Sequence, residues 1–237
     1  MKLAIMQPYF MPYLGYFALI NHVDQFILFD TPQYIRHGWI ERNRILKQDG
    51  DSMYIKVPLE KHHRETPINK IEINNNINWK SKIFAQLGHY KKRAPYYNHV
   101  IALLETIFKN DYKSIVELNH KTLLIICDYL DIKTPISIWS EMNLEIEPVS
   151  APDEWALNIS KGLNAKSYFN PPGGRTFFDN EKYKKAGIDL KFLEISVEPY
   201  KQPIQGFVGY LSVIDVMMFC DKEEIQKMIN KVHITNL

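Results

Sequence analysis

The chain opens with Met1-Lys-Leu-Ala-Ile-Met-Gln-Pro-Tyr-Phe-Met-Pro-Tyr-Leu-Gly15 and then reaches Gln25-Phe-Ile-Leu-Phe-Asp30. The first apolar run ends close to a proline and predicts a buried strand over residues 2–6. Residues 16–22 have the spacing of a helix, and residues 26–29 form a second continuous apolar run. A strand, a loop, a helix and a strand within about 30 residues predict a βαβ unit, which builds a parallel sheet.

Two loops leave the carboxyl ends of these predicted strands. Residues 7–15 carry prolines, aromatic residues and a glycine, and residues 30–44 are dense in hydrogen-bonding and aromatic side chains. Ligands of open parallel sheets bind beyond the carboxyl ends of the strands. We therefore expect the functional site between these loops, although an ordered surface loop would also explain residues 30–44.

Size and composition limit the class of protein. The 237 residues are enough for one domain, and we expect a single domain over residues 1–237. A net charge of +2 argues against nucleic acid as a partner. We expect no membrane span, because no apolar stretch reaches the ~20 residues that one requires, and we expect no signal peptide. Only two cysteines occur, which predicts a cytoplasmic protein without a disulfide framework.

The remaining chain alternates between helical and strand patterns. Amphipathic spacing predicts a helical block at about residues 79–133, which we expect to cover one side of the sheet. Short strands are predicted at 53–59, 69–73, 135–139, 167–170 and 190–195, and closing helices at 209–219 and 222–232. The predicted fold class is therefore α/β, with a parallel, Rossmann-like sheet flanked by helices.

Metal binding and covalent catalysis have little support in the motifs. His62 and His63 are adjacent, and the other histidines are dispersed, so no metal site is predicted. Cys127 and Cys220 lie in apolar, helix-like surroundings that indicate packing. The chain has no Gly-x-Ser-x-Gly elbow and no glycine-rich nucleotide loop of the known patterns, and no motif identifies a cofactor.

Two features indicate other chemistry. The turn Gly173-Gly-Arg175 follows a predicted strand and would suit an anion, with a tight turn and a solvent-facing arginine as the alternative. His37 lies in the loop that begins at Asp30, and the two would suit a general base and its carboxylate, with an exposed loop histidine as the alternative. Asn43 and Arg44 follow and would orient a ligand.

Aromatic residues gather in the same two loops. The set is Tyr9, Tyr13, Tyr16, Tyr34 and Trp39. Such rings stack well against sugars or bases, and core packing explains part of the set equally well.

These motifs together resemble the WbqC-like protein family. The resemblance is carried by Ile5-Met-Gln-Pro-Tyr-Phe-Met-Pro-Tyr-Leu-Gly-Tyr-Phe17, Asp30-Thr-Pro-Gln-Tyr34, His37-Gly-Trp-Ile-Glu-Arg-Asn43, Trp79 with Lys82, Ala94-Pro-Tyr96, Pro172-Gly-Gly174, Tyr200-Lys-Gln202 and Leu211-Ser-Val-Ile-Asp215. It spans essentially the whole chain and departs at Phe219-Cys-Asp221, where a glycine is expected. The resemblance implies a bacterial transferase of O-antigen or lipopolysaccharide biosynthesis that moves an acyl or aminoacyl group, such as glycyl, to a nucleotide-linked amino sugar.

On this hypothesis the loops and the glycine turn form one transferase site. His37 would deprotonate the sugar amine, and Asp30 would orient His37. The expected substrate-binding residues are Gln7, Tyr9, Tyr13, Gly15, Gln33, Tyr34, Trp39, Asn43, Arg44, Gly173, Gly174 and Arg175. The expected partner is a sugar nucleotide, and delivery of the acyl group by an acyl-carrier protein stays open.

A second likeness is to the nucleotidyltransferase superfamily. Its His-x-Gly-His loop would correspond to Pro12-Tyr-Leu-Gly-Tyr16, where tyrosines stand in place of histidines. Tyrosine cannot supply the positive charge that the histidines give to a triphosphate in the transition state. Nucleotidyl transfer or ATP-dependent ligation, and a non-catalytic binding module, remain as alternatives.

Overall fold

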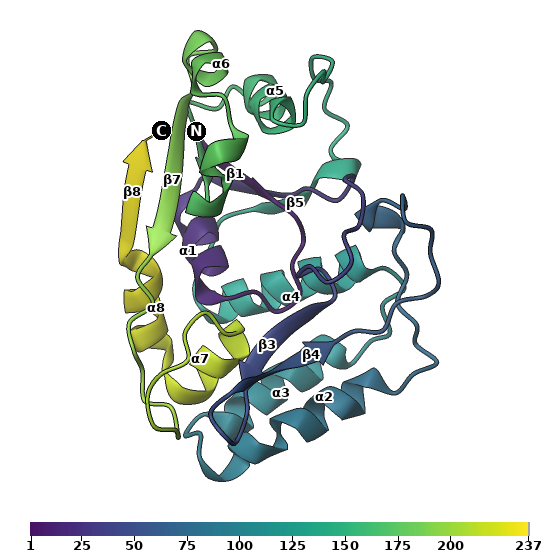
Figure 1. The fold of residues 1–237 in the computed structure, drawn as a ribbon, viewed down its shortest axis with the longest axis vertical. Coiled ribbons are helices and arrows are strands. Elements are labelled where there is room, and N and C mark those ends of the chain that lie inside the picture. Colours follow the sequence, from purple (N-terminus) through teal and green to yellow (C-terminus); the bar gives the residue numbers. More distant parts are fainter. Residues whose placement is uncertain (237) are drawn as a thin grey trace.

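A computed structural model describes residues 1–236 and centres on a six-stranded sheet in the order β5-β2-β1-β6-β7-β8 (Figure 1). The strands are β1 Lys2–Met6, β2 Gln25–Leu28, β5 Ile136–Ile138, β6 Ser167–Asn170, β7 Asp189–Ile195 and β8 Val232–Asn236. Every neighbouring pair is parallel except β7 with β8. The predicted α/β class with a parallel, Rossmann-like sheet is confirmed.

Both faces of the sheet are buried. Successive strand residues point to opposite faces, so Leu3 and Ile5 join one hydrophobic core while Ala4 joins the other. The smaller core includes residues of α5 (Glu154–Gly162) and α6 (Asn180–Lys185). Burial on both faces explains why the central strands are continuous apolar runs rather than alternating ones.

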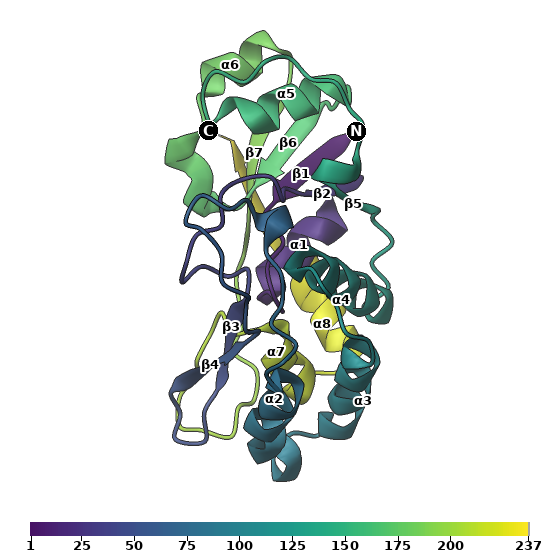
Figure 2. The same cartoon turned by 90° about the vertical axis from the view of Figure 1, so that its right-hand side faces the viewer.

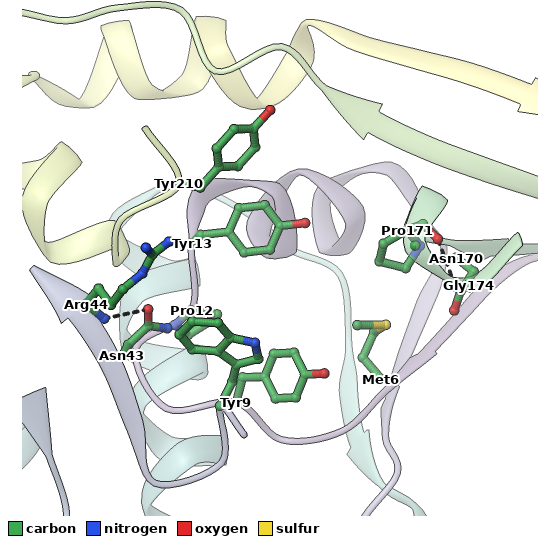
Figure 3. A pocket seen from close by; sticks show the side chains of 12 residues that line it. Met6, Tyr9, Pro12, Tyr13, Asn43, Arg44, Asn170, Pro171, Gly174 and Tyr210 are labelled. Atoms are coloured by element: carbon green, nitrogen blue, oxygen red, sulfur yellow. Dashed lines mark hydrogen bonds between the residues drawn. The ribbon is translucent and has the colours of Figure 1, made fainter. Parts of the chain in front are cut away.

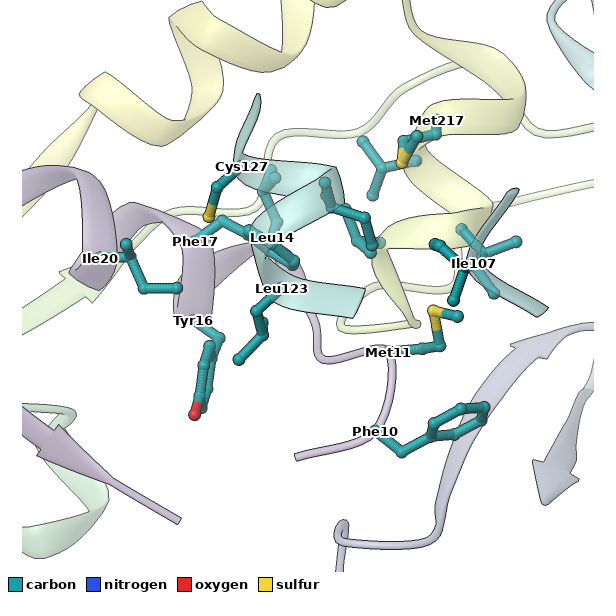
Figure 4. Close-up of a cluster of buried hydrophobic side chains, with 14 of the residues drawn as sticks. Phe10, Met11, Leu14, Tyr16, Phe17, Ile20, Ile107, Leu123, Cys127 and Met217 are labelled. Carbon is teal, nitrogen blue, oxygen red and sulfur yellow. The ribbon is translucent and has the colours of Figure 1, made fainter. Parts of the chain in front are cut away.

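The larger core lies on the other face and contains most of the helices (Figure 2). The helices outside the smaller core are α1 Leu14–His22, α2 Trp79–Leu87, α3 Tyr97–Phe108, α4 Ile115–Tyr129, α7 Val213–Phe219 and α8 Lys222–Asn230. Figure 4 shows Phe10 and Met11, from the loop after β1, in one cluster with Leu123 and Cys127 of α4. Burial raises the pKa of the Cys127 thiol to about 12, which fits the predicted packing role.

The helical block lies differently from the prediction. We expected it to cover one side of the sheet, and α4 does contact β5. Of the other two helices, α2 contacts β4 (Ser52–Lys56), which forms a hairpin with β3 (Arg42–Leu46), and α3 contacts α4 and α7. Figures 1 and 2 show this hairpin and the helices below it as a lower part of the molecule, with the sheet above.

Three predicted elements need correction. The strand expected at residues 69–73 is a 3₁₀ turn, η1 (Ile68–Lys70), because the buried Ile68 and Ile71 are three residues apart and match the 3₁₀ period. The helix expected from residue 209 begins only at Val213, after the Ser212 cap, whose side chain accepts a hydrogen bond from Ile214 N. The end of the loop predicted at residues 30–44 is the start of β3.

The strand order reverses between β1 and β6. From β1 the chain proceeds to β2 on one side, whereas β6 leads to β7 on the other. The crevice at the carboxyl ends of such a strand pair is where open α/β sheets bind ligands. Within residues 1–236, no helix is both long enough and apolar enough to cross a membrane.

Candidate functional site

Two adjoining cavities lie at this reversal of strand order. One has a volume of about 430 Å³ and includes the charged Arg44 in its lining, and we call it the polar chamber. The other has a volume of about 590 Å³ and no charged residue in its described lining, and we call it the apolar chamber. Their linings share Met6, Tyr9, Asn170 and Gly174, so the two chambers form one cleft.

The polar chamber is built from segments that are far apart in the sequence (Figure 3). Its lining consists of Met6, Tyr9, Pro12, Tyr13, Trp39, Asn43, Arg44, Asn170, Pro171, Gly173, Gly174 and Tyr210. Figure 3 shows Asn43 and Arg44 of β3 on one side of the chamber and Asn170 and Gly174 on the other. Thus residues from both predicted loops and from the glycine turn line one chamber, although Asn43 and Arg44 belong to the strand β3 rather than to a loop.

Hydrogen bonds to the loop backbones hold the chamber open. Asn119, fully buried in α4, donates from Nδ2 to the carbonyl oxygens of Pro8 and Ile40, both at 2.8 Å. Phe10 N donates to Trp39 O at 2.8 Å. One interior amide therefore fixes both loops to the same helix. Asn119, Pro8 and Ile40 do not line the chamber, so these bonds position its walls and leave its lining side chains free for a ligand.

Arg44 is the one charged residue in the described lining of the polar chamber, which includes no carboxylate. Its backbone is fixed at both ends, because its N–H donates to Asn43 Oδ1 at 2.8 Å and its carbonyl accepts from Ser212 N at 2.8 Å. Its Nε is buried and makes no hydrogen bond within residues 1–236, and its guanidinium carbon lies 5.8 Å from the centre of the Trp39 ring. An unpaired guanidinium in a cavity suits a phosphate or carboxylate ligand.

Asn43, by contrast, has a structural role. Its Oδ1 accepts the Arg44 N–H and its Nδ2 donates to Phe10 O at 3.1 Å. Both ends of the amide are thus occupied, and Asn43 joins β3 to the first loop. Its expected role in binding a ligand is accordingly limited to shaping the wall.

The tyrosines of the polar chamber are hydrogen-bond donors rather than bases. Burial raises the pKa of the Tyr9 and Tyr13 hydroxyls, and the nearby Tyr9, Tyr210 and Glu194 raise that of Tyr13 further. Both hydroxyls therefore stay protonated near neutral pH. The Tyr13 ring covers Gly15, where an added Cβ would lie 2.3 Å from Tyr13 Cε2, so Gly15 makes room for this ring instead of touching a ligand.

Tyr210 reaches the polar chamber from the segment before α7. Its ring centre lies 6.1 Å from that of Tyr13. The segment is anchored by the fully buried Asp215, whose carboxylate accepts from Tyr90 and Tyr200 hydroxyls at 2.5 Å each and from Gln202 Nε2 at 2.9 Å. Burial raises the pKa of Asp215, and these three donors oppose that rise.

The apolar chamber lies between the ends of β1, β2 and β6. Its lining consists of Ile5, Met6, Gln7, Tyr9, Phe29, Thr31, Pro32, Ile35, Pro152, Trp155, Ala156, Tyr168, Asn170, Gly174, Phe177 and Phe178. The rings of Phe29 and Trp155 are 5.4 Å apart, and those of Phe177 and Phe178 are 5.1 Å apart. Of this lining, the sequence had singled out only Gln7, Tyr9 and Gly174.

The glycine turn is divided by the fold. Gly173 and Gly174 line the cleft, and a Cβ on Gly174 would lie 2.2 Å from Asn170 Nδ2, so a side chain here would displace the Asn170 amide. Arg175 lines neither chamber. Its guanidinium instead donates to Thr235 Oγ1 and stacks 5.2 Å from the Phe192 ring centre, so of the two arginines expected to bind substrate only Arg44 lines the cleft.

Asp30 and His37 are not joined in the structure. Asp30 is 1% exposed, and its two carboxylate oxygens accept from Ser140 N at 3.0 Å and Ser140 Oγ at 2.6 Å. His37 is exposed, has φ of 65° and offers its carbonyl to Arg42. Within the described part of the chain no hydrogen bond or ion pair connects the expected pair, and neither residue lines the cleft.

His37 lines a third cavity of about 820 Å³, which we call the His37 pocket. Its lining consists of Tyr34, Arg36, His37, Glu41, Lys56, Pro58, Leu59, Glu60, Lys61, His62, Ile77, Trp79 and Lys82. Glu41 is 2% exposed and its Oε2 makes no hydrogen bond among the described residues. Tyr34, which we expected to bind substrate in the cleft, lines the His37 pocket instead. Gln33 lies outside the cleft lining, and its side chain donates to Arg64 O at 2.8 Å.

No group of three His, Cys, Asp or Glu side chains within residues 1–236 is arranged to hold a metal ion.

Sequence reasoning missed several residues at or behind the cleft. Asn170 had a usable signal, because it ends a predicted strand before Pro171. Tyr210, Trp155 and the buried Asn119 had none, because their positions depend on long-range packing.

Comparison with known proteins places these observations in a family. The model of the WbqC-like protein family matches residues 7–227, nearly the whole chain. The chain is also similar to the uncharacterized protein Rv1507c of Mycobacterium tuberculosis, with 26% identity over 218 residues, 91% of this chain and 92% of that protein. No solved structure matches the chain significantly.

Proposed function

Because the chain belongs to the WbqC-like protein family, we propose that it is a cytoplasmic transferase of bacterial surface-polysaccharide biosynthesis. It transfers an acyl or aminoacyl group to the amine of a nucleotide-linked amino sugar in the cleft. The observation that carries this proposal is the guanidinium of Arg44, which has no carboxylate partner in the described lining of an aromatic cavity at the strand reversal.

The polar chamber supplies what a sugar nucleotide needs. Arg44 binds a phosphate group by charge-assisted hydrogen bonds. Gly173 leaves open space beside the turn, which lets the ligand approach the backbone closely. Tyr13 and Trp39 offer ring faces for the sugar or the base.

The chemistry in this cleft depends on orientation and hydrogen bonding. The sugar amine attacks the acyl carbonyl, a C–N bond forms, and the bond from the carbonyl carbon to its leaving group breaks, while the leaving group takes the proton that the nitrogen releases. Negative charge then develops on the carbonyl oxygen, and the protonated hydroxyls of Tyr9 and Tyr13 are available to stabilise it. The described lining of the two chambers includes no Asp, Glu, His, Cys or Lys, so the proposal does not depend on Asp30 or His37.

Calorimetric titration with UDP- and dTDP-linked amino sugars tests the proposal. We expect binding by the wild type and a large loss in Arg44→Met, whereas Arg36→Met, in the His37 pocket, should bind as the wild type does. Mass spectrometry of the sugar nucleotide after incubation with acyl-CoA or activated glycine then detects the added group. Magnesium-dependent binding of ATP with pyrophosphate release would instead support nucleotidyl transfer, and no response to any of these ligands would contradict an enzyme of either kind.

A further inference from the structure

We propose that the apolar chamber is the subsite for an aliphatic acyl chain, so that the transferred group is a hydrophobic acyl group rather than an aminoacyl group. This inference rests on the proposed function, because it assigns the donor half of the same cleft. It takes as donor an activated acyl thioester. The amine nitrogen attacks the carbonyl carbon, the C–N bond forms as the C–S bond breaks, and the proton released by nitrogen passes to the departing thiolate.

The walls of the apolar chamber are suited to a chain of methylene groups. Phe29 and Trp155 form one aromatic pair and Phe177 and Phe178 another, with Ala156 from α5 also in the lining. A volume of about 590 Å³ exceeds what a single small amino acid side chain would fill. Burial of apolar surface in such a cavity drives binding without directional contacts.

The mouth of this chamber is apolar as well. Ile35, from the loop after β2, is 65% exposed, and Phe177, from the turn after β6, is 53% exposed. Both side chains line the chamber although they come from segments far apart in the sequence. Large apolar side chains that stay in water around a cavity mark a site that an apolar ligand covers.

The polar groups of this chamber do not suit an aminoacyl group. Its described lining includes no carboxylate that could pair with an ammonium. The Asn170 amide makes two hydrogen bonds within the chain, because its Nδ2 donates to Pro171 O at 2.9 Å and its Oδ1 accepts from the Tyr168 hydroxyl at 3.2 Å. Thr31 Oγ1 is buried in the same lining without a hydrogen bond among the described residues, and it offers a hydroxyl but no charge. An ammonium placed here would leave water without gaining a counter-charge, which is costly.

The junction of the chambers brings the two halves of the reaction together. Tyr9 and Asn170 belong to both linings, so the two chambers are continuous. The phosphate of the sugar nucleotide can therefore lie at Arg44 while the acyl chain lies in the apolar chamber, and a single alkyl phosphate can span both. The carbonyl carbon of a donor would then lie beside Tyr9, where the sugar amine arrives from the polar chamber.

A series of alkyl phosphates with four, six and eight carbons tests the inference by calorimetry. We expect the affinity of the wild type to rise about threefold to fourfold with each added methylene, the gain for moving one such group out of water. An affinity that does not change with chain length would overturn the inference.

Variants separate the two halves of the cleft. The double variant Ile35→Ser/Phe177→Ser changes exposed side chains and should reduce the gain per methylene, whereas Ile77→Ser, a 50% exposed residue of the His37 pocket, should leave it unchanged. Arg44→Met should weaken every member of the series by the same factor. A gain per methylene that the double variant leaves intact would show that the chain binds elsewhere and would overturn the inference.

The same data distinguish failure of the inference from failure of the proposed function. An effect of Arg44→Met without a chain-length gain would leave the anion site standing and remove the acyl-chain subsite. A chain-length gain that Arg44→Met does not shift would keep the subsite but remove Arg44 as the phosphate ligand. Loss of both would contradict the site as a whole.

Discussion

The cleft and the His37 pocket differ in a way that is instructive for locating function. The cleft lies at the reversal of strand order and has Arg44 as its one charged residue among the described lining residues. The His37 pocket is larger than either chamber of the cleft and its lining includes more ionisable side chains, but that lining comes from loops, β4 and α2. Titratable residues in the sequence would predict the functional site in the His37 pocket, whereas the strand order of the sheet predicts it in the cleft.

One short loop supplies both regions. Trp39 lines the cleft, whereas His37, only two residues before it, lines the His37 pocket. The backbone here is fixed, since the carbonyl oxygens of His37 and Gly38 accept from the Arg42 guanidinium and Trp39 O accepts from Phe10 N. Proximity in sequence therefore did not mean a shared site, because this fixed loop presents neighbouring side chains to different cavities.

The largest expected effect concerns Arg44. Replacing Arg44 by Met should weaken binding of a nucleotide-linked amino sugar about 100-fold or more, because a charge-assisted contact to a desolvated phosphate is lost. Titration calorimetry on folded protein measures the loss. Arg36→Met is the matched control, and an equal loss in both variants would remove the distinction between the cleft and the His37 pocket.

Asp215 tests how the wall of the cleft is supported. Asp215→Ala removes the carboxylate that accepts from the hydroxyls of Tyr90 and Tyr200 and from the amide of Gln202, which should lower the free energy of unfolding by about 3 kcal/mol. Urea denaturation measures this change. Tyr200→Phe removes one donor only and should cost about 1 kcal/mol. Equal stability of Asp215→Ala and the wild type would show that this network does not hold the segment.

Asn119 links the two regions, because it bonds both loops. Asn119→Ala should cost about 2 kcal/mol of stability, since two buried carbonyl groups lose their donor. It should also weaken sugar nucleotide binding, because the loops that shape the polar chamber lose their common anchor. Thermal unfolding and calorimetry on the same sample measure both effects. Unchanged binding in a destabilised variant would mean that the other backbone contacts suffice to fix the loops.

The smallest expected effect is that of His37. His37→Asn keeps a residue type that tolerates the observed φ of 65°, so stability should change by about 0.5 kcal/mol or less. Sugar nucleotide binding should also be within about twofold of the wild type, since His37 does not line the cleft. We also expect turnover close to that of the wild type. A fall in turnover of about 100-fold, the usual effect of losing a general base, would instead support the base role that the sequence suggested.

Much of the architecture was predictable from local patterns. The central strands appear as continuous apolar runs because both faces of a parallel sheet are buried, and their ends fell within a few residues of those predicted. β8 was missed, since this antiparallel edge strand is only partly buried and its pattern is weak. β3 was missed because its two arginines alternate with buried residues and obscure the apolar signal.

The site was predictable in part. Tyr9 and Tyr13 follow β1 and Gly173 and Gly174 follow β6, so they meet around one chamber because the carboxyl ends of these paired parallel strands share an edge. Trp39 and Arg44 reach the same chamber from the loop before the hairpin and from its strand β3. The pairing of Asp30 with His37 was not formed, because Ser140 occupies the Asp30 carboxylate from a distant part of the chain. Arg175 points to Thr235 on the edge strand, which no local pattern indicated.

The sequence by itself determined the parallel sheet, the two loops at its carboxyl edge and the membership in a family that the whole chain resembles. The sheet and the loops follow from hydrophobic period and turn chemistry, which act over a few residues, whereas the family follows from motifs spread along the chain. Only the tertiary structure decided which arginine lacks a partner, which loop residue faces which cavity and where an apolar chamber opens. Those properties depend on contacts such as that of Asn119 with Pro8, 111 residues apart, and no local pattern encodes them.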